Sequence, residues 1–201
     1  MAKYEEHRFL TIVFGVGFYY PDSYGGTEAY VHTLALHLQH LGHRCIVIAP
    51  AASAETRYFH EGIEVIRFTF RSPSRDEIIG LAPVHNLEAV AKLVRSLQPD
   101  VFHLHSLTSA LGLPHLYKIK ELGIATVFTG HVPGVVCPRG DMLRMGTTPC
   151  DGVVEWNKCT TCLLNQKGLS APLGTLCAAL VSPFRYTRAV QRYLPLFYVP
   201  Q

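Results

Sequence analysis

Long apolar stretches are missing from this 201-residue sequence. No run approaches the roughly 20 residues that a helix needs to cross a bilayer. The first nine residues carry five charged or histidine positions where a signal peptide has an apolar core. These absences lead us to expect a cytoplasmic protein. Charged residues are also scarce, at 16%, whereas 48% of the residues are hydrophobic, which excludes intrinsic disorder as the main state.

A strong excess of one charge sign is missing too. Eighteen Lys and Arg residues stand against fifteen Asp and Glu residues, and the net charge is +3. The excess lies in residues 138–201, which hold seven basic and three acidic residues. A nucleic-acid-binding protein has a denser basic surface, so we expect no nucleic-acid partner. Six cysteines without a secretion signal argue against a disulfide framework.

Apolar strands alternate with amphipathic helices through the first two thirds of the chain. Buried strands are predicted at residues 9–14, 44–49, 101–105 and 124–128, and a strand nearer the sheet edge at 63–70. Helices are predicted at residues 27–41, 86–97 and 108–122, the last with a bend near Pro114. Strand–helix–strand units with short connections require parallel strands and right-handed crossovers. We therefore predict an α/β fold with a doubly wound, mostly parallel sheet.

The regular pattern stops at residue 132. Residues 132–168 are rich in Pro, Gly and Cys and have few periodic apolar positions, and helical character returns at residues 172–193. We expect a single domain over residues 1–201, with 132–168 forming a Cys-rich loop that leaves the sheet. A loop of this length is uncommon in a compact domain unless it is functional, disordered or cross-linked.

A dinucleotide fingerprint is absent. In open parallel sheets, ligands bind beyond the carboxyl ends of the strands. After the first strand, Gly15 and Gly17 begin such a fingerprint, but the third glycine is missing and no helix follows directly. The second strand ends in Ala49 and Pro50, without the acidic residue that binds a ribose hydroxyl. We therefore expect neither NAD nor FAD.

Two other positions at strand ends are candidate ligand contacts. Gly25 and Gly26 precede the first helix, where backbone amides without side chains can approach a phosphate or a sugar hydroxyl. The alternative is a tight turn that needs a positive φ angle. His131 follows the last predicted strand, either as a ligand contact or as a surface histidine. His103 and His105 share one face of a strand, and we expect them to be packed and hydrogen-bonded rather than to bind a metal.

Four cysteines are crowded into the excursion from the sheet. Cys137, Cys150, Cys159 and Cys162 are separated by 12, 8 and 2 residues. Four thiolates satisfy a tetrahedral Zn²⁺ ion, and a structural zinc would hold together a loop with little apolar core. The first spacing is irregular for a zinc ribbon, and an iron–sulfur cluster, reduced thiols or disulfides are alternatives. A structural zinc is our expectation among these.

Several motifs occur together, in order, and each at a predicted strand end. They read Pro21-Asp-Ser-Tyr-Gly-Gly-Thr-Glu28, Pro99-Asp-Val-Phe-His-Leu-His105, Thr129-Gly-His131 and Cys137-Pro-Arg-Gly140. Over nearly the whole chain, this set resembles the N-terminal, acceptor-side domain of family 4 retaining glycosyltransferases with the GT-B fold. The resemblance implies a Rossmann-like domain. It also implies that Gly25 and Gly26 lie against the donor phosphates or the acceptor, and that His131 points toward the donor sugar.

The same resemblance implies an activity shared with a second domain. Such enzymes move a sugar from a nucleoside-diphosphate sugar to a hydroxyl group of a glycan or lipid-linked acceptor, with retention. We expect this chain alone to be inactive, because the 201 residues do not include the C-terminal donor-binding domain. A further domain or a partner subunit would supply the donor-binding half. No general base or nucleophile is assigned. The alternative is a non-catalytic α/β binding or scaffold module with a zinc-stabilised interaction loop.

Three arginines near the end of the chain have helical spacing, namely Arg185, Arg188 and Arg192. We expect a solvated or salt-bridged face here. A peripheral contact with a membrane of anionic lipid is the alternative.

Overall fold

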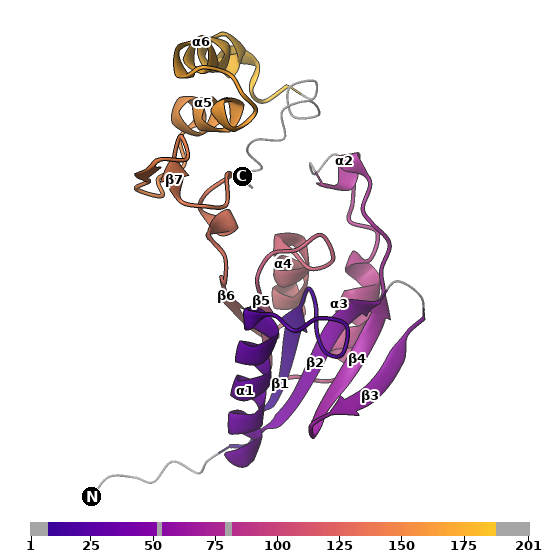
Figure 1. Cartoon of the computed structure of the whole chain (residues 1–201). Helices are drawn as coiled ribbons and strands as arrows, with labels where there is room; N and C mark the ends of the chain where they lie inside the picture. Colours follow the sequence, from indigo (N-terminus) through magenta and orange to yellow (C-terminus); the bar gives the residue numbers. More distant parts are fainter. Residues whose placement is uncertain (1–7, 52–53, 79–81, 188–201) are drawn as a thin grey trace, which may run out of the picture. The chain divides into compact units, whose positions relative to one another are not determined.

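The computed structural model describes residues 8–51, 54–78 and 82–187 (Figure 1). The chain divides into two compact units, each described by itself below. The sheet unit comprises Met1–Pro73 and His85–His131, and the cysteine unit comprises Ser74–Val84 and Val132–Gln201. The whole predicted excursion, residues 132–168, lies in the cysteine unit.

The sheet unit is built on a six-stranded sheet with the strand order β3-β4-β2-β1-β5-β6. All neighbouring strands are parallel except β3 and β4, which are antiparallel. The predicted doubly wound, mostly parallel α/β sheet is therefore confirmed. The strands are β1 (Thr11–Val16), β2 (Arg44–Ala51), β3 (Thr56–His60), β4 (Ile63–Thr69), β5 (Val101–His105) and β6 (Ala125–Thr129).

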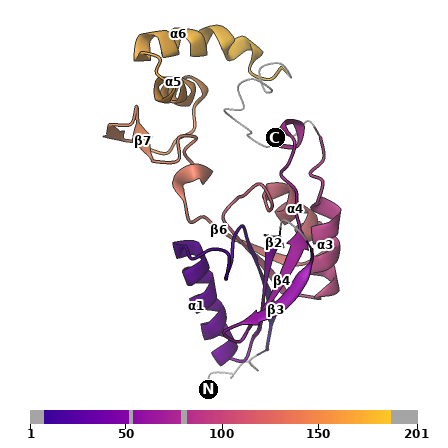
Figure 2. The same ribbon diagram turned by 45° about the vertical axis from the view of Figure 1, so that its right-hand side comes forward.

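Helices cover both faces of this sheet (Figures 1 and 2). The helix α1 (Gly26–His40) packs on one face, and α3 (Leu87–Ser96) and α4 (Leu113–Glu121) pack on the other. Successive strand residues point to opposite faces, so Val13 packs against the α3 and α4 side and Phe14 against the α1 side. Burial on both faces explains why the inner strands read as continuous apolar runs.

The edge strand β3 was not predicted from the sequence. Most of its residues are exposed or half-buried, which hides the apolar pattern of a strand. It joins β4 through Glu61 and Gly62, whose φ angles of 44° and 86° are those of a tight hairpin turn.

The predicted helix boundaries need two corrections. The first helix begins at Gly26 with Gly25 as its N-cap, one residue before its predicted start. The helix predicted at residues 108–122 begins only at Leu113, so Pro114 lies in its first turn and causes no bend. Proline is well tolerated there because the first amides of a helix have no helical partner. The first helix ends before Gly42, whose φ angle of +92° is the left-handed conformation typical of the residue after a helix.

A buried polar network joins α3 and α4. Asn86 is the N-cap of α3, but its side-chain amide donates to the Ala110 carbonyl (2.9 Å) instead of accepting from the helix amides. Its Oδ1 atom lies 3.1 Å from Nε2 of His115, and the Gly112 amide donates to Nδ1 of His115 (3.2 Å). Burial, and then the nearby His85, lower the pKa of His115 to about 4, so this histidine is neutral at neutral pH.

The cysteine unit contains more regular structure than the predicted loop. Its elements are α2 (Arg75–Ile78), η1 (Pro133–Val135), β7 (Leu143–Arg144), β8 (Thr148–Pro149), α5 (Trp156–Gln166), α6 (Ala171–Val181) and η2 (Ser182–Phe184). The last part of the predicted loop is thus the helix α5. Its buried positions 159–162 are cysteine and threonine, which masked the apolar periodicity. The close approach of Gly174 to Thr161 brings α6 against it.

The second predicted helix of this region ends earlier than expected. The sequence predicted helical character from residue 172 to residue 193, whereas α6 ends at Val181. Pro183 has no backbone N–H to continue the helical hydrogen bonds, and the chain goes on from Ser182 as the short 3-10 helix η2. Arg188 and Arg192 of the predicted basic face lie outside the described residues, and Arg185 donates to the Ser182 carbonyl and hydroxyl, each at 3.0 Å.

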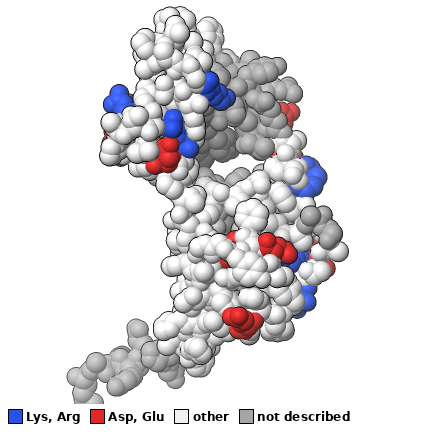
Figure 3. Space-filling model, viewed as in Figure 1, with Lys and Arg blue, Asp and Glu red and all other residues white. Residues whose placement is uncertain are grey.

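Neither a long apolar helix nor a dense charged patch was expected from the sequence. No helix in the described part of the chain is both long and apolar enough to span a membrane. On the face drawn in Figure 3, acidic and basic side chains are few and both signs occur among the described residues. The low charge content of the sequence is therefore visible on this face.

Candidate functional site

Three neighbouring strands of the sheet unit end at the same edge. Val16 of β1 is in register with His105 of β5, which is in register with Thr129 of β6. Directly after β5, Ser106 has a φ angle of 65°, and its amide donates to the Thr129 carbonyl (2.9 Å). Left-handed backbone at a residue other than glycine is costly and is often found at functional sites. This edge is the carboxyl end of the parallel strands, where open sheets bind ligands.

The predicted site histidine His131 meets a buried histidine of β5 at this edge. Nδ1 of His105 lies 2.9 Å from Nε2 of His131, and the two rings are stacked with their centroids 5.2 Å apart. Tyr30 of α1 packs edge-on against His131, with the two ring centroids 5.0 Å apart. His105 is fully buried and His131 is half-buried. His131 is therefore held between a buried histidine and the first turns of α1.

The histidine pair on β5 is packed and hydrogen-bonded, as predicted. The ring centroids of His103 and His105 are 3.9 Å apart, and Nε2 of His103 lies 2.8 Å from the Thr129 hydroxyl. Burial, followed by the charges of His103 and His131, lowers the pKa of His105 to about 3. Burial and His131 also lower the pKa of His103. Nε2 of His105 is buried without a hydrogen-bond partner among the described residues, which is unusual for a polar atom.

Gly25 and Gly26 have different structural roles at the start of α1. Gly25 has an extended conformation, with φ −104° and ψ 177°, so the alternative of a tight turn with positive φ is wrong there. A Cβ atom on Gly25 would lie 2.5 Å from Oε2 of Glu28. A Cβ atom on Gly26 would meet nothing within 4 Å. A side chain at position 25 would therefore have to displace the Glu28 carboxylate, whereas Gly26 leaves the start of the helix open.

A buried carboxylate sets the electrostatics of this turn. Glu28 lies in the first turn of α1, is 5% exposed and accepts a hydrogen bond from the Ser23 hydroxyl. A carboxylate at a helix N-terminus is stabilised by the helix dipole. The same negative charge repels a phosphate, so a ligand with neutral hydroxyl groups fits this turn better than an anion does.

Arg67 is a buried residue of the site that the sequence analysis missed. It lies in β4, is 4% exposed, and donates to the backbone carbonyls of Tyr19 (2.8 Å) and Tyr20 (2.9 Å). Its guanidinium also pairs with the exposed Asp22 (2.9 Å). These contacts fix the segment that leads from β1 to Gly25. The available signal was an arginine placed between Ile66 and Phe68 in a predicted strand.

A second missed cluster lies between α1 and the β3–β4 hairpin. His32, His60 and Glu61 form the only group in the described residues with three candidate metal-ligand atoms within 4.8 Å of one another. Both ring nitrogens of His32 already have partners, namely the Tyr19 hydroxyl (3.0 Å) and the Glu61 carboxylate (3.0 Å). We interpret this cluster as a polar network. No sequence spacing could reveal it, because its members come from separate elements.

The four predicted metal-ligating cysteines line one pocket of the cysteine unit. They are Cys137, Cys150, Cys159 and Cys162, and all are free thiols. Cys159 and Cys162 lie one turn apart on α5, which corrects their predicted place in a loop knuckle. Burial raises the pKa of Cys137, but the nearby backbone amides of residues 139–142 outweigh burial and hold that pKa below its usual value. Burial raises the pKa of Cys159.

Comparison with known proteins agrees with the motifs. The sequence model of Glycosyltransferase Family 4 matches residues 24–147. One of the subunits of human phosphatidylinositol N-acetylglucosaminyltransferase is 27% identical over 116 residues, which are 57% of this chain and 24% of the relative. The chain thus spans about a quarter of the length of this curated relative.

Two solved structures align with part of the chain. The first is a structure described as "Trehalose-6-phosphate from E. coli bound with UDP-2-fluoro glucose". It aligns with a TM-score of 0.41 and 12% identity, over 61% of this chain and 33% of that one. An alpha,alpha-trehalose-phosphate synthase (UDP-forming) from Burkholderia vietnamiensis aligns with a TM-score of 0.38 and 12% identity, over 62% and 33%. The family match rests on the sequence model, which covers more than half of the residues. The chain belongs to glycosyltransferase family 4, as its motifs indicated.

Proposed function

We propose that this chain is the acceptor-side domain of a retaining glycosyltransferase with the GT-B fold. In this proposal the complete enzyme moves a sugar from a nucleoside-diphosphate sugar to a hydroxyl group of a glycan or lipid-linked acceptor. The observation that carries the proposal is the convergence of the β1, β5 and β6 ends on the His105–His131 pair beside α1, in a chain of family 4. A C-terminal domain or a partner subunit supplies the donor-binding half.

The site residues act by positioning the reacting groups. The side-chain-free start of α1 at Gly26 admits the acceptor, and the Glu28 carboxylate accepts a hydrogen bond from one of its hydroxyl groups more readily than it tolerates a phosphate. Nε2 of His131 is engaged with His105, so a contact of His131 with the donor sugar uses Nδ1. We assign no general base or nucleophile.

The human relative suggests which substrates to test first. Its name describes an N-acetylglucosaminyltransferase of phosphatidylinositol that is built from subunits. We therefore start the donor panel with a nucleoside-diphosphate N-acetylglucosamine and the acceptor panel with phosphatidylinositol. Other sugar nucleotides and hydroxyl acceptors follow in the same assay.

The first experiment measures release of nucleoside diphosphate by this chain alone and by the chain joined to its donor-binding half. We expect turnover only in the complete enzyme, with the anomeric configuration of the donor retained in the product as read by NMR. Robust transfer by the isolated chain would refute the proposal that it is half of an enzyme. An inverted product would refute the retaining mechanism.

A second experiment separates the enzyme from a non-catalytic scaffold. Gly26→Val in the complete enzyme is expected to lower turnover by at least about tenfold, because the added side chain occupies open space where the acceptor binds. The melting temperature stays close to that of the wild type for the same reason. His40→Ala, at an exposed histidine of α1, is the matched control and leaves turnover unchanged. Unchanged turnover in Gly26→Val supports the scaffold and contradicts the proposed site.

A further inference from the structure

Residues 132–158 have a defined conformation without an apolar core. Cys137 is the only buried residue in this stretch. Five valines that could have formed a core are instead exposed, namely Val132, Val135, Val136, Val153 and Val154. Met142 and Met145 have left-handed φ angles of 57° and 53°, a conformation that side chains disfavour. A stretch that buries so little apolar surface needs another source of stability.

The four cysteines supply the candidate source. Cys137, Cys150 and the α5 pair Cys159 and Cys162 line the same pocket. Three of the four are buried, and Cys150 is half-buried. They come from three separate segments of the cysteine unit, so one shared ligand would tie these segments together.

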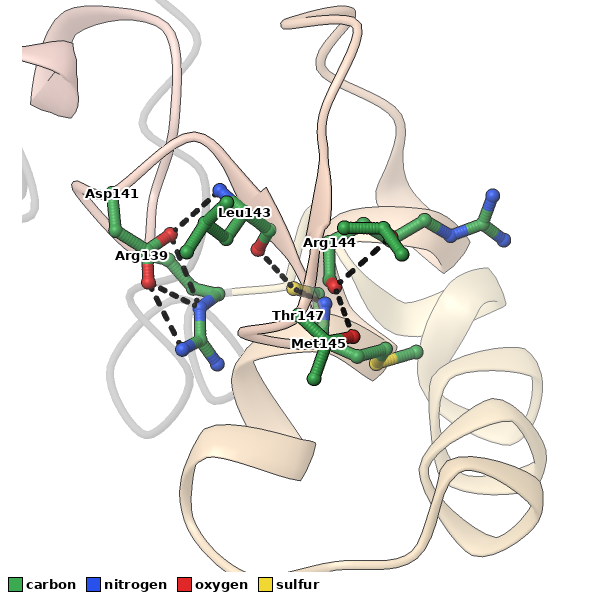
Figure 4. A network of polar contacts seen from close by, with 8 residues as sticks. Arg139, Asp141, Leu143, Arg144, Met145 and Thr147 are labelled. Atoms are coloured by element: carbon green, nitrogen blue, oxygen red, sulfur yellow. Dashed lines mark hydrogen bonds and ion pairs between the residues drawn. The ribbon is translucent and has the colours of Figure 1, made fainter.

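A backbone amide is directed at one of the four sulfur atoms. The Met145 amide donates to the sulfur of Cys162 (3.2 Å), and Figure 4 shows the polar network around Met145 and Leu143. A metal-bound thiolate accepts such bonds well, whereas a thiol is a weak acceptor. Donors placed around sulfur are the outer contacts expected of a metal site.

Basic side chains also line this pocket. They are Arg139, Arg144 and Lys158, and two of them have acidic partners, Asp141 at 3.0 Å and Asp151 at 2.7 Å. Four thiolates around a divalent ion carry a net charge of about −2. The basic residues offset part of that charge, which a purely apolar pocket would not.

From these observations we infer that Cys137, Cys150, Cys159 and Cys162 bind one zinc ion that replaces the missing core of residues 132–158. Each thiol loses its proton on binding, so up to four protons are released for each zinc. The four sulfurs share a pocket but lack the 4.8 Å spacing found in the His32, His60 and Glu61 cluster. We therefore expect the ion to draw the sulfurs together. This inference is independent of the proposed transfer reaction.

The experiment begins with the metal content of the 201-residue chain purified without added metal. We expect about one zinc per chain by mass spectrometry, and four thiols that react with a thiol reagent only after a chelator removes the metal. Trp156, the single tryptophan of the sequence, lies in α5 and should change its fluorescence on metal removal. Metal-free protein with four reactive thiols, disulfides among the four, or iron with acid-labile sulfide would each overturn the inference.

Variants then identify the ligands. Cys150→Ser is expected to reduce the bound zinc at least about tenfold, and Cys177→Ser, at a half-buried cysteine of α6, is the matched control that retains it. Cobalt added to the zinc-free wild type should give the absorption bands of tetrahedral thiolate coordination. If Cys150→Ser fails to fold, the zinc content and the cobalt spectrum of the wild type still show whether the cysteines bind the metal. Full zinc retention in Cys150→Ser, with loss in His32→Ala, would assign the metal to the His32 cluster and refute the inference.

Discussion

Replacing Arg67 by methionine tests whether this buried arginine fixes the segment before α1. Methionine keeps most of the stem volume but has no N–H group, so the carbonyls of Tyr19 and Pro50 lose their Arg67 donor bonds of 2.8 Å and 3.2 Å. The Tyr20 carbonyl keeps the Tyr58 hydroxyl as a donor, and the Tyr19 carbonyl keeps the Asp22 amide (3.2 Å). Hydrogen bonds from a charged donor contribute about 1.5–3 kcal/mol each. We expect the sheet unit to lose about 3 kcal/mol of unfolding free energy.

Urea unfolding followed by far-UV circular dichroism measures this loss, and Trp156 fluorescence reports separately on the cysteine unit. The ion pair of Arg67 with Asp22 adds little, because Asp22 is 73% exposed. Arg44→Met is the matched control, since Arg44 is 56% exposed and pairs with Glu64 at the surface. It should change the unfolding free energy by less than about 1 kcal/mol. A change of similar size in Arg67→Met would refute the reasoning.

Two further predictions concern the same unit. Histidines of the unfolded chain bind protons near pH 6.5, whereas folded His105 and His115 do so only near pH 3 and 4. Below pH 6.5 the unfolded state therefore binds more protons than the folded state. As the pH falls, each histidine lowers the unfolding free energy by on the order of 1.4 kcal/mol per pH unit. Urea unfolding at pH 7.5 and pH 5 measures how the unfolding free energy depends on pH. His115→Gln should weaken this dependence, and an unchanged dependence in the variant would contradict the prediction. Gly25→Ala should lower the melting temperature by placing a methyl group against Glu28, whereas Gly26→Ala should raise it slightly by stiffening the unfolded chain. Equal shifts would contradict the packing difference.

Periodicity predicted the parts of the fold whose residues are buried on regular faces. The inner strands were found as continuous apolar runs, and α1 and α3 were found because their apolar residues repeat with the period of a helix. The strand β3 was missed because an edge strand is mostly exposed, and α5 was missed because cysteine and threonine fill its buried face. Both failures arise where burial does not coincide with apolar residues.

The candidate site could be predicted only in part. The strand-end rule placed Gly26 and His131 near the same edge, because parallel strands carry their carboxyl ends to one side. The buried partners could not be predicted, since Arg67 and His32 make contacts across long sequence separations. Such contacts depend on the register of neighbouring strands and on the turn between β3 and β4, which local patterns do not determine.

The scarcity of buried side chains in residues 132–158 has a consequence for how the chain melts. If zinc binds only the folded cysteine unit, each tenfold rise in free zinc above the dissociation constant adds about 1.4 kcal/mol to the stability of that unit. The sheet unit, with its own core on both faces of the sheet, gains nothing from the ion. Calorimetry should then show one transition that follows the zinc concentration and one that ignores it. Folding of the cysteine unit would thus be set by metal supply as much as by sequence.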